Sequence, residues 1–307
     1  MTPAAAEVQV EVEGRTLKVS NLDKVLYPEA GFTKGQVIDY YTRVAPALLP
    51  HLQGRALTLK RYPNGVDAQF FYEKRCPSHR PSWMTTAPIW SGRKNETIDY
   101  CVVNELPALV WVANLASLEL HTSLSRADHP ERPTMCVFDL DPGPPATIVD
   151  CGQVGLWLRD VLDQLGVEAW AKTSGSKGLQ LYVPLNLKTT YDDTKPFARA
   201  LAQLLEKQHP EVVVSVMAKE RRKGKVFIDW SQNDPHKTTV CVYSLRARPR
   251  PTVSTPVTWE EVEQAADGDT SLLEIDAPAV LERIEAHGDL FAPVVEKRQK
   301  LPKPPAP

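Results

Sequence analysis

The 307-residue sequence lacks the features that mark membrane and secreted proteins. No uninterrupted apolar run reaches about 18 residues, the length that a membrane-spanning helix requires. The start, Met-Thr-Pro-Ala-Ala-Ala, has neither a basic segment nor a long apolar core, which argues against a secretory signal. We therefore expect a cytoplasmic protein with no membrane partner.

Paired cysteine motifs are also missing. The five cysteines form no Cys-x-x-Cys pair, so the sequence carries no zinc signature. Three of them lie in apolar runs. We therefore expect buried thiols of a reducing cytoplasm. The cysteines are Cys76, Cys101, Cys136, Cys151 and Cys241.

An excess of charge of one sign is absent as well. The chain has 36 Lys and Arg against 38 Asp and Glu, a formal net charge of −2. Any nucleic-acid surface must then be a local basic stripe. Each candidate cluster could equally be a solvated face. The clusters are Lys60-Arg61, Lys74-Arg75, Arg93-Lys94, 219–225 and 246–250.

Carboxylates inside apolar, strand-like runs are the most informative residues that are present. Asp139 and Asp141 lie in Val-Phe-Asp-Leu-Asp-Pro-Gly, and Asp229 lies in Val-Phe-Ile-Asp-Trp. Alternate residues of a strand share a face, so Asp139 and Asp141 would project together, and two like charges need compensation. With a third carboxylate they form an all-oxygen set suited to Mg²⁺ or Mn²⁺. Asp141 alone could instead be a turn residue, because Asp-Pro-Gly commonly ends a strand.

A glycine-containing turn lies between the two carboxylate segments. In Lys172-Thr-Ser-Gly-Ser-Lys-Gly-Leu-Gln180, backbone amides, two serines and Lys177 could form an anion cradle, although such a turn could simply join two strands. The spacing of a P-loop is absent. Metal ligands beside a phosphate cradle indicate nucleotidyl transfer.

Periodicity and capping signals predict a mixed order of strands and helices. Thr33 followed by Gln36 predicts a capped helix, which Pro46 could end early. No internal repeat is visible. We expect disorder over residues 1 to about 7 and an extended, mobile tail over 297–307. The expected elements are a hairpin at 8–19, helices at 34–49, 106–120, 148–165, 194–208 and 278–286, strands near 97–103, 212–218 and 225–230, the last two paired across 219–224, and a strand pair around the glycine turn.

The motifs resemble those of the archaeo-eukaryotic primase superfamily, and more closely the polymerase domain of bacterial ligase D and its stand-alone actinobacterial paralogues. The likeness covers nearly the whole chain. It extends from Asn21-Leu-Asp-Lys-Val-Leu-Tyr-Pro28 through Lys60-Arg-Tyr-Pro-Asn-Gly65 and Leu118-Glu-Leu-His121 to Tyr243-Ser-Leu-Arg246. The resemblance implies an α+β fold with a primase-type catalytic core, in which two mixed β-sheet lobes flanked by helices enclose a cleft. It implies one catalytic domain over 1–295, with lobes of roughly 1–125 and 126–295, and a flexible Pro/Lys-rich tail over 296–307.

The resemblance also implies a function. The expected enzyme is a primer- and template-dependent polymerase that uses two Mn²⁺ or Mg²⁺ ions, prefers ribonucleotides over deoxyribonucleotides and fills short gaps at broken, 5′-phosphorylated DNA ends near the nucleoid. The resemblance implies metal and catalytic roles for Asp139, Asp141 and Asp229, of which Asp229 would orient the primer 3′-hydroxyl. It implies nucleotide binding by Lys60, His121, Ser174, Lys177, Gln232 and Arg246. It implies DNA binding by Lys24 and Lys34 at the 5′-phosphate, Phe70 and Phe71 on the template, Arg222 at the primer terminus, and a loop at 90–97 in joining ends.

Two departures from the family pattern stand out. Gln180 replaces the histidine that usually follows Gly-Leu, and no Lys-x-Asp-Gly ligase motif is present. We therefore expect a separate DNA ligase, together with the Ku end-binding protein, as partners. Two other functions stay open: a primase-polymerase that starts strands de novo, which the 5′-phosphate lysines disfavour, and a non-catalytic DNA-end binding module, which the three carboxylates disfavour.

Overall fold

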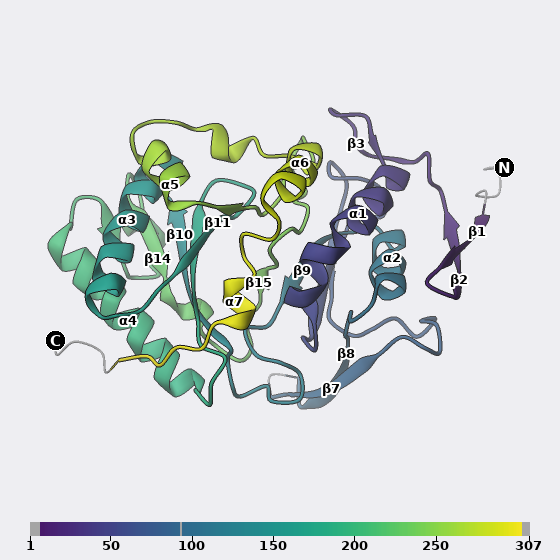
Figure 1. Cartoon of the computed structure of the whole chain (residues 1–307), viewed down its shortest axis with the longest axis horizontal. Coiled ribbons are helices and arrows are strands. Elements are labelled where there is room, and N and C mark those ends of the chain that lie inside the picture. Colours follow the sequence, from purple (N-terminus) through teal and green to yellow (C-terminus); the bar gives the residue numbers. More distant parts are fainter. Residues whose placement is uncertain (1–6, 93, 303–307) are drawn as a thin grey trace.

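The computed structural model describes residues 7–92 and 94–302, which form two six-stranded sheets surrounded by helices (Figure 1). The expectation of disorder over the first residues falls on 1–6, outside the described part, whereas Glu7 already belongs to a strand. No helix within the described ranges is both long and apolar enough to cross a membrane. The fold is of the mixed α+β class that the sequence predicts.

The first sheet has the strand order β15-β9-β5-β8-β7, with β6 paired to β5. Its helices α1 and α2 pack against one another, and the hairpin β1–β2 lies at that end of the molecule (Figure 1). The bounds in this half are β1 (Glu7–Val12), β2 (Arg15–Ser20), β3 (Val25–Tyr27), β4 (Phe32–Thr33), α1 (Lys34–Leu52), β5 (Leu57–Arg61), β6 (Phe71–Glu73), β7 (Thr86–Ser91), β8 (Glu96–Cys101), α2 (Leu106–Asn114), β9 (Ser117–Thr122) and β15 (Thr239–Val240).

The second sheet has the order β13-β14-β10-β12-β11-β16, with α3 and α4 packed on it and α5 packed on α3 (Figure 1). The bounds here are β10 (Met135–Pro142), α3 (Ile148–Gln164), β11 (Trp170–Thr173), β12 (Leu179–Pro184), α4 (Tyr191–Gln208), β13 (Val213–Val214), η1 (Lys219–Arg221), β14 (Val226–Asp229), η2 (Trp230–Gln232), β16 (Pro256–Val257), α5 (Trp259–Ala266), η3 (Ser271–Leu273), α6 (Ala277–His287) and α7 (Pro293–Glu296).

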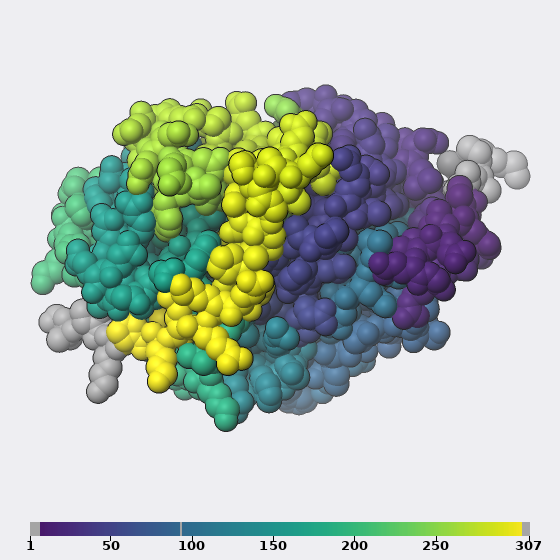
Figure 2. All heavy atoms as spheres, in the orientation of Figure 1, coloured from purple at the N-terminus to yellow at the C-terminus, as the bar shows by residue number. Residues whose placement is uncertain are grey.

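The C-terminal segment joins the two halves. Residues 277–302 run across the face of the molecule between them (Figure 2). Val280 and Val294 are fully buried in the core of the first half. Residues near the C-terminus therefore complete a core formed mostly by residues from the N-terminal half of the sequence. The tail predicted at 296–307 packs at its start, where Gln299 donates a hydrogen bond from its backbone to Leu185 O at 3.1 Å. The lobe boundaries and the tail's flexibility stay predictions.

Several predicted elements form as expected. The hairpin, the strand pair around the glycine turn and the helices at 148–165, 194–208 and 278–286 all form, within a few residues of the predicted bounds. Thr33 and Gln36 make the reciprocal hydrogen bonds of a capping box at the start of α1. Pro46 does not end α1, which continues to Leu52 because its apolar face is buried along its whole length.

Two local predictions are wrong. The helix expected over 106–120 ends at Asn114, because Ala116 adopts a left-handed conformation (φ 55°) and the chain turns into β9 between β5 and β15. The strands expected at 212–218 and 225–230 do pair, but β13 and β14 run parallel. The chain between them therefore crosses over instead of forming a hairpin.

The prediction of five free thiols is also wrong. Cys76 and Cys101 form a disulfide, and Cys136, Cys151 and Cys241 are free and buried. The backbone N–H of Cys76 donates to Asp99 O at 2.7 Å, which holds the segment of Cys76 beside β8. This contact brings together two cysteines that no sequence motif links.

Candidate active site

Strand pairing brings the predicted carboxylates to one face of the second sheet. Asp139 on β10 lies directly opposite Asp229 on β14 and, on its other side, opposite Gln180 on β12. Residues directly opposite in antiparallel strands present their side chains on the same face. Asp141, two residues along β10, shares that face. The carboxylates thus come from two neighbouring strands, and the paired Asp139 and Asp229 are 90 positions apart in the sequence.

Asp139 lies in a polar network that reaches the interior of the sheet. Its Oδ1 accepts a hydrogen bond from Gln180 Nε2 at 3.0 Å, and Gln180 Oε1 accepts one from Lys172 Nζ at 2.6 Å. Burial, with the added charges of Asp229 and Asp141, raises the pKa of Asp139 to about 6 despite the hydrogen bond from Gln180. Burial lowers the pKa of Lys172 to about 7. The site is therefore short of positive charge around Asp139.

The two other carboxylates have partners of their own. Asp229 Oδ1 accepts hydrogen bonds from the backbone and hydroxyl of Ser231, and Oδ2 accepts one from Gln232 Nε2 at 2.8 Å. Asp141 pairs with Lys177 at 2.9 Å and lies 4.0 Å from Arg222. These internal partners occupy the carboxylate oxygens.

The three carboxylates have the donor chemistry of a divalent-cation site without its closed arrangement. In the ranges 7–92 and 94–302, no group of three or more His, Cys, Asp or Glu side chains is arranged to hold a metal ion. The chemistry of the set nevertheless fits Mg²⁺ or Mn²⁺, since all ligands would be carboxylate oxygens. Asp139 and Asp229 lie directly opposite one another with Asp141 on the same face, and a cation would compensate these like charges.

The glycine turn after β11 is closed mainly by its own serine. Ser174 Oγ accepts the backbone N–H groups of Ser176 at 3.3 Å and Gly178 at 3.1 Å. Gly175 has φ +65°, the left-handed conformation that glycine adopts without strain. Two of the amides expected to receive an anion therefore donate to Ser174 instead, which corrects the prediction of a cradle built from free amides.

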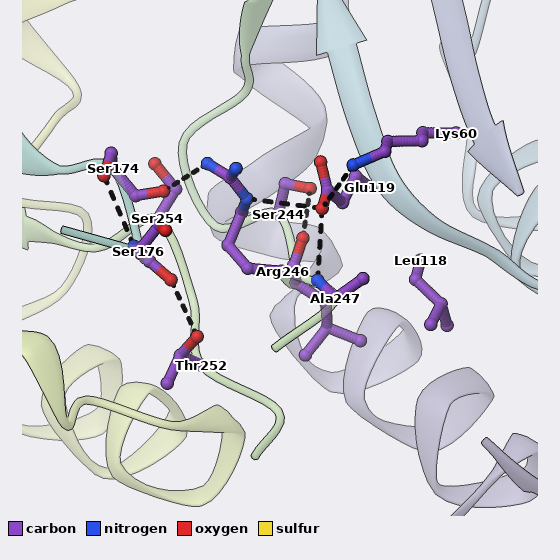
Figure 3. A network of polar contacts seen from close by, with 12 residues as sticks. Lys60, Leu118, Glu119, Ser174, Ser176, Ser244, Arg246, Ala247, Thr252 and Ser254 are labelled. Atoms are coloured by element: carbon purple, nitrogen blue, oxygen red, sulfur yellow. Dashed lines mark hydrogen bonds and ion pairs between the residues drawn. The ribbon is translucent and has the colours of Figure 1, made fainter. Parts of the chain in front are cut away.

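A buried carboxylate on β9 holds two cationic side chains and a histidine together. Glu119 is only 2% exposed and contacts Lys60 and Arg246 (Figure 3). It also contacts His121. Our sequence analysis missed Glu119 and named only its three partners as candidates. The signal was present in Leu118-Glu-Leu-His121, where a carboxylate interrupts an apolar strand as Asp139 does.

A cavity of about 280 Å³ lies between the two sheets and collects most of the predicted nucleotide-binding residues. Lys60 and Asp229 do not line it, but Lys60 bonds to Glu119 and Asp229 to Gln232. The lining side chains predicted from the sequence are His121, Asp139, Asp141, Ser174, Lys177, Gln232 and Arg246. Gln180, the departure from the family pattern, also lines the cavity.

Three successive aromatic side chains at and before β6 lie exposed. Phe70 and Phe71 are 44% and 43% exposed, so both members of the predicted pair reach solvent. Tyr72, which the sequence analysis did not single out, is 58% exposed, and its ring lies 6.0 Å from that of His121. Lys60 Nζ lies 4.4 Å from the Phe70 ring centroid. Phe70 and Tyr72 thus adjoin the network around Lys60, whereas Phe71 contacts Arg61, whose guanidinium lies 5.1 Å from its ring.

The two lysines predicted to bind a 5′-phosphate differ in exposure. Lys24 is exposed, with Nζ donating to Asn64 Oδ1 at 2.8 Å. Lys34, at the start of α1, is 6% exposed and its Nζ donates to Ser20 O at 2.6 Å. Burial, with the nearby charges of Lys24 and Arg61, lowers the pKa of Lys34 to about 8.

The remaining candidates lie at two edges of the site. The Arg222 guanidinium stacks on the ring of Phe227 at 3.7 Å and donates from Nη2 to Met217 O. The stretch predicted at 90–97 begins in the last residues of β7 and ends in the first residues of β8, and Trp90 on β7 is 57% exposed. Arg93, from one predicted basic cluster, lies outside the described residues.

Comparison with known proteins assigns this arrangement to a family. The family model of the LigD primase-polymerase domain matches residues 33–291. The chain belongs to this family. The polymerases of the family are nucleotidyltransferases, which agrees with a cavity that combines carboxylates with cationic side chains.

Individual relatives support the same assignment. The multifunctional non-homologous end joining protein LigD of Mycolicibacterium smegmatis is 42% identical over 280 residues, which are 91% of this chain and 36% of the relative. The bifunctional non-homologous end joining protein LigD of Bacillus subtilis is 31% identical over 276 residues, 90% of this chain and 43% of the relative. The chain thus spans less than half the length of these relatives.

A solved structure confirms the fold. The polymerase domain from Mycobacterium tuberculosis ligase D, in complex with DNA, superposes with a TM-score of 0.85 at 37% sequence identity. The match covers 92% of this chain and 99% of that domain.

Proposed function

We propose that the chain is a primer- and template-dependent polymerase that prefers ribonucleotides and fills short gaps during the joining of broken DNA ends. The observation that carries the proposal is the register of Asp139 opposite Asp229, beside a cavity that Asp139 lines together with the cationic side chains of Lys177 and Arg246. The names of the relatives, which are end-joining proteins, and the DNA in the solved complex support the choice of substrate.

Asp139, Asp141 and Asp229 would hold two divalent ions, Mn²⁺ or Mg²⁺. Such ions, when bound, activate a 3′-hydroxyl and neutralise charge on the transferred phosphate. For this, Lys177 has to release Asp141, and a triphosphate offers it a stronger anionic partner. Asp229, which accepts a hydrogen bond from the backbone of Ser231, would orient the primer 3′-hydroxyl.

The cationic residues would receive the triphosphate. Lys60 and Arg246 carry permanent positive charge at the site, and charge-assisted hydrogen bonds to phosphate are among the strongest that side chains make. Ser174 and Gln232 add neutral donors at the cavity. His121, which lies beside Glu119 Oε2 while Lys60 and Arg246 lie beside Oε1, would also contact the phosphates.

The exposed surfaces would hold DNA. Phe70 and Phe71 would stack on template bases, to which Tyr72 adds a third ring. Arg222 would help to place the primer terminus, and the turn at 90–97 would help to join two ends. A DNA ligase and the Ku end-binding protein would be the partners of the reaction near the nucleoid, and residues 1–295 would act as one catalytic domain.

One assay tests the proposal. The purified chain is given a gapped duplex with a 5′-phosphate, Mn²⁺ or Mg²⁺, and matched ribo- or deoxyribonucleotides. We expect gap filling, with kcat/KM for ribonucleotides at least about tenfold higher, because a polar pocket that bonds the 2′-hydroxyl is left unpaired without it. Synthesis on a single strand without primer would favour the de novo primase. Binding without synthesis under every metal condition would leave only a DNA-end binding module.

A second prediction concerns the 5′-phosphate. The Lys34 ammonium is present below its pKa of about 8 and lost above it, whereas the phosphate is a dianion throughout this range. At constant ionic strength and pH 7, we expect the 5′-phosphate to tighten binding to a gapped duplex by about tenfold. The preference should shrink between pH 7 and pH 9.

Variants separate the lysines from general charge effects. Lys24→Gln combined with Lys34→Met should remove the preference at every pH, and Lys18→Gln, an exposed lysine on β2, should leave it intact. Equal affinity of the unaltered protein for phosphorylated and dephosphorylated gaps at pH 7 would refute the assignment of both lysines.

A further inference from the structure

Glu119 is placed where a carboxylate is costly. It lies in the middle of β9, in register with Lys60 on β5, and between the fully buried Leu118 and Leu120. A buried charge is tolerated only when it is paired and hydrogen-bonded. The structure provides such partners from three separate parts of the chain.

Each carboxylate oxygen has defined donors. Oε1 accepts hydrogen bonds from Lys60 Nζ at 3.2 Å and from the backbone N–H of Ala247 at 3.1 Å, and it lies 3.5 Å from Arg246 Nε (Figure 3). Oε2 lies 2.9 Å from His121 Nε2. Because a carboxylate can only accept, the neutral imidazole of His121 must donate from Nε2.

These contacts outweigh the effect of burial. Burial alone would raise the pKa of Glu119, but the hydrogen bond from His121 and the charges of Arg246 and Lys60 hold it well below its usual range. Glu119 is thus a fixed anion at any working pH. One negative charge faces the two permanent positive charges of Lys60 and Arg246, so a net positive charge remains.

Arg246 extends this network to the second sheet. Its Nε faces Glu119, while its Nη1 donates to Ser174 O in the glycine turn at 2.5 Å. Thr252 Oγ1 donates to Gly175 O in the same turn at 2.7 Å. Figure 3 shows Arg246 between Glu119 and Lys60 on one side and the serine turn on the other. The position of Glu119 therefore sets the distance between Lys60 and the turn across the cavity.

We propose that Glu119 is a positioning residue that holds Lys60, His121 and Arg246 in the arrangement that receives the nucleotide triphosphate. The inference rests on the proposed function. Without the anion, Lys60 and Arg246 repel one another, and the donors spread apart. Glu119 itself need not touch the nucleotide, because Oε1 and Oε2 are occupied by the groups that do.

The test compares steady-state gap filling by Glu119→Gln with the unaltered protein. Glutamine keeps the shape of the side chain and removes its charge. We expect the KM for ribonucleotide to rise about tenfold, with kcat at saturating nucleotide changed by less than about threefold, as expected when ground-state binding is lost. Glu105→Gln, which breaks a surface pair with Arg15 at 3.0 Å, is the matched control and should keep the KM unchanged.

A double variant adds a readout that a purely structural role would not move. Lys60→Met and Glu119→Gln together remove one positive and one negative charge. If Glu119 acts through Lys60, the combined rise in KM is smaller than the product of the two single effects. Independent, multiplicative effects would contradict positioning through Lys60.

The outcomes distinguish the inference from the function on which it rests. A folded Glu119→Gln protein with an unchanged KM overturns the inference, even if its unfolding temperature is lowered. Absence of extension by the unaltered protein overturns the proposed function instead. Should Glu119→Gln fail to fold, Glu119→Asp decides, because it keeps the charge but withdraws it by one methylene. A raised KM then supports positioning, and an unchanged KM refutes it.

Discussion

Asp139→Asn is expected to abolish primer extension while leaving the protein at least as stable as before. The asparagine keeps the shape of the side chain but removes a charge that, in the proposed mechanism, would hold divalent ions. Loss of their contribution of several kcal/mol corresponds to a rate loss of roughly a thousandfold or more. Asp139 lies opposite Asp229 with Asp141 on the same face, so its charge also opposes folding when no cation is present. Extension assays and thermal unfolding in EDTA measure the two effects separately.

The control for this variant is an aspartate away from the cavity. Asp163→Asn, at an exposed position near the end of α3, makes the same chemical change and should extend primers like the unaltered protein. Binding of Asp139→Asn to a gapped duplex should remain within about threefold, because the predicted phosphate contacts are cationic side chains elsewhere. Extension by Asp139→Asn within tenfold of the unaltered protein would remove Asp139 from the catalytic set.

The carboxylate strands could be predicted because their signal is local. A carboxylate within an apolar strand, as at Asp139 and Asp229, is visible in a window of a few residues. The register of β10 against β14 depends on the pairing of residues such as Asp139 and Asp229, which are 90 positions apart in the sequence, and no local pattern specifies it. The sequence therefore predicts which residues form the site, but not which of them lie opposite one another.

The interaction of Gln180 also required the structure. The resemblance marks this position as a departure from the family, where a histidine is usual, and leaves its contact open. In the structure, Gln180 accepts from Lys172 and donates to Asp139. An amide suits this position because it offers one acceptor and one donor at the same time. A neutral imidazole offers the same pair, which gives a physical reason for both residues at one position.

The wrong predictions have tertiary causes. Residues 106–120 are mostly apolar, a pattern that suits either a helix or a buried strand. The residues after Ala116 form a strand because they pair with β5 and β15. The parallel pairing of β13 and β14 and the disulfide between Cys76 and Cys101 likewise depend on where distant segments pack. Composition and spacing carry no signal for such contacts.

Gly178→Ala is expected to damage both stability and catalysis, because the turn at Gly178 touches the strand that carries the carboxylates. A methyl group on Gly178 would lie 2.2 Å from the carbonyl oxygen of Leu140, far inside contact distance. Leu140 stands between Asp139 and Asp141, so relief of this clash must move β10 away from β12. We expect a loss of about 1–3 kcal/mol in the free energy of unfolding. A displacement of the carboxylates by about 1 Å should lower kcat roughly a hundredfold.

The glycine at position 92 provides the comparison for stability. A methyl group there meets nothing within 4 Å, so Gly92→Ala should leave the unfolding temperature within about 1 °C of the unaltered protein, since a surface change without a new contact costs little. Kinetics of Gly178→Ala are measured well below its own unfolding temperature, so that loss of folded protein does not mimic loss of catalysis.

Because the clash involves two backbones, side-chain rotation cannot relieve it. If Gly178→Ala leaves both kcat and the unfolding temperature unaltered, the backbones of the glycine turn and β10 lie farther apart than the 2.2 Å between the added methyl group and Leu140 O implies. The turn then does not position the carboxylates.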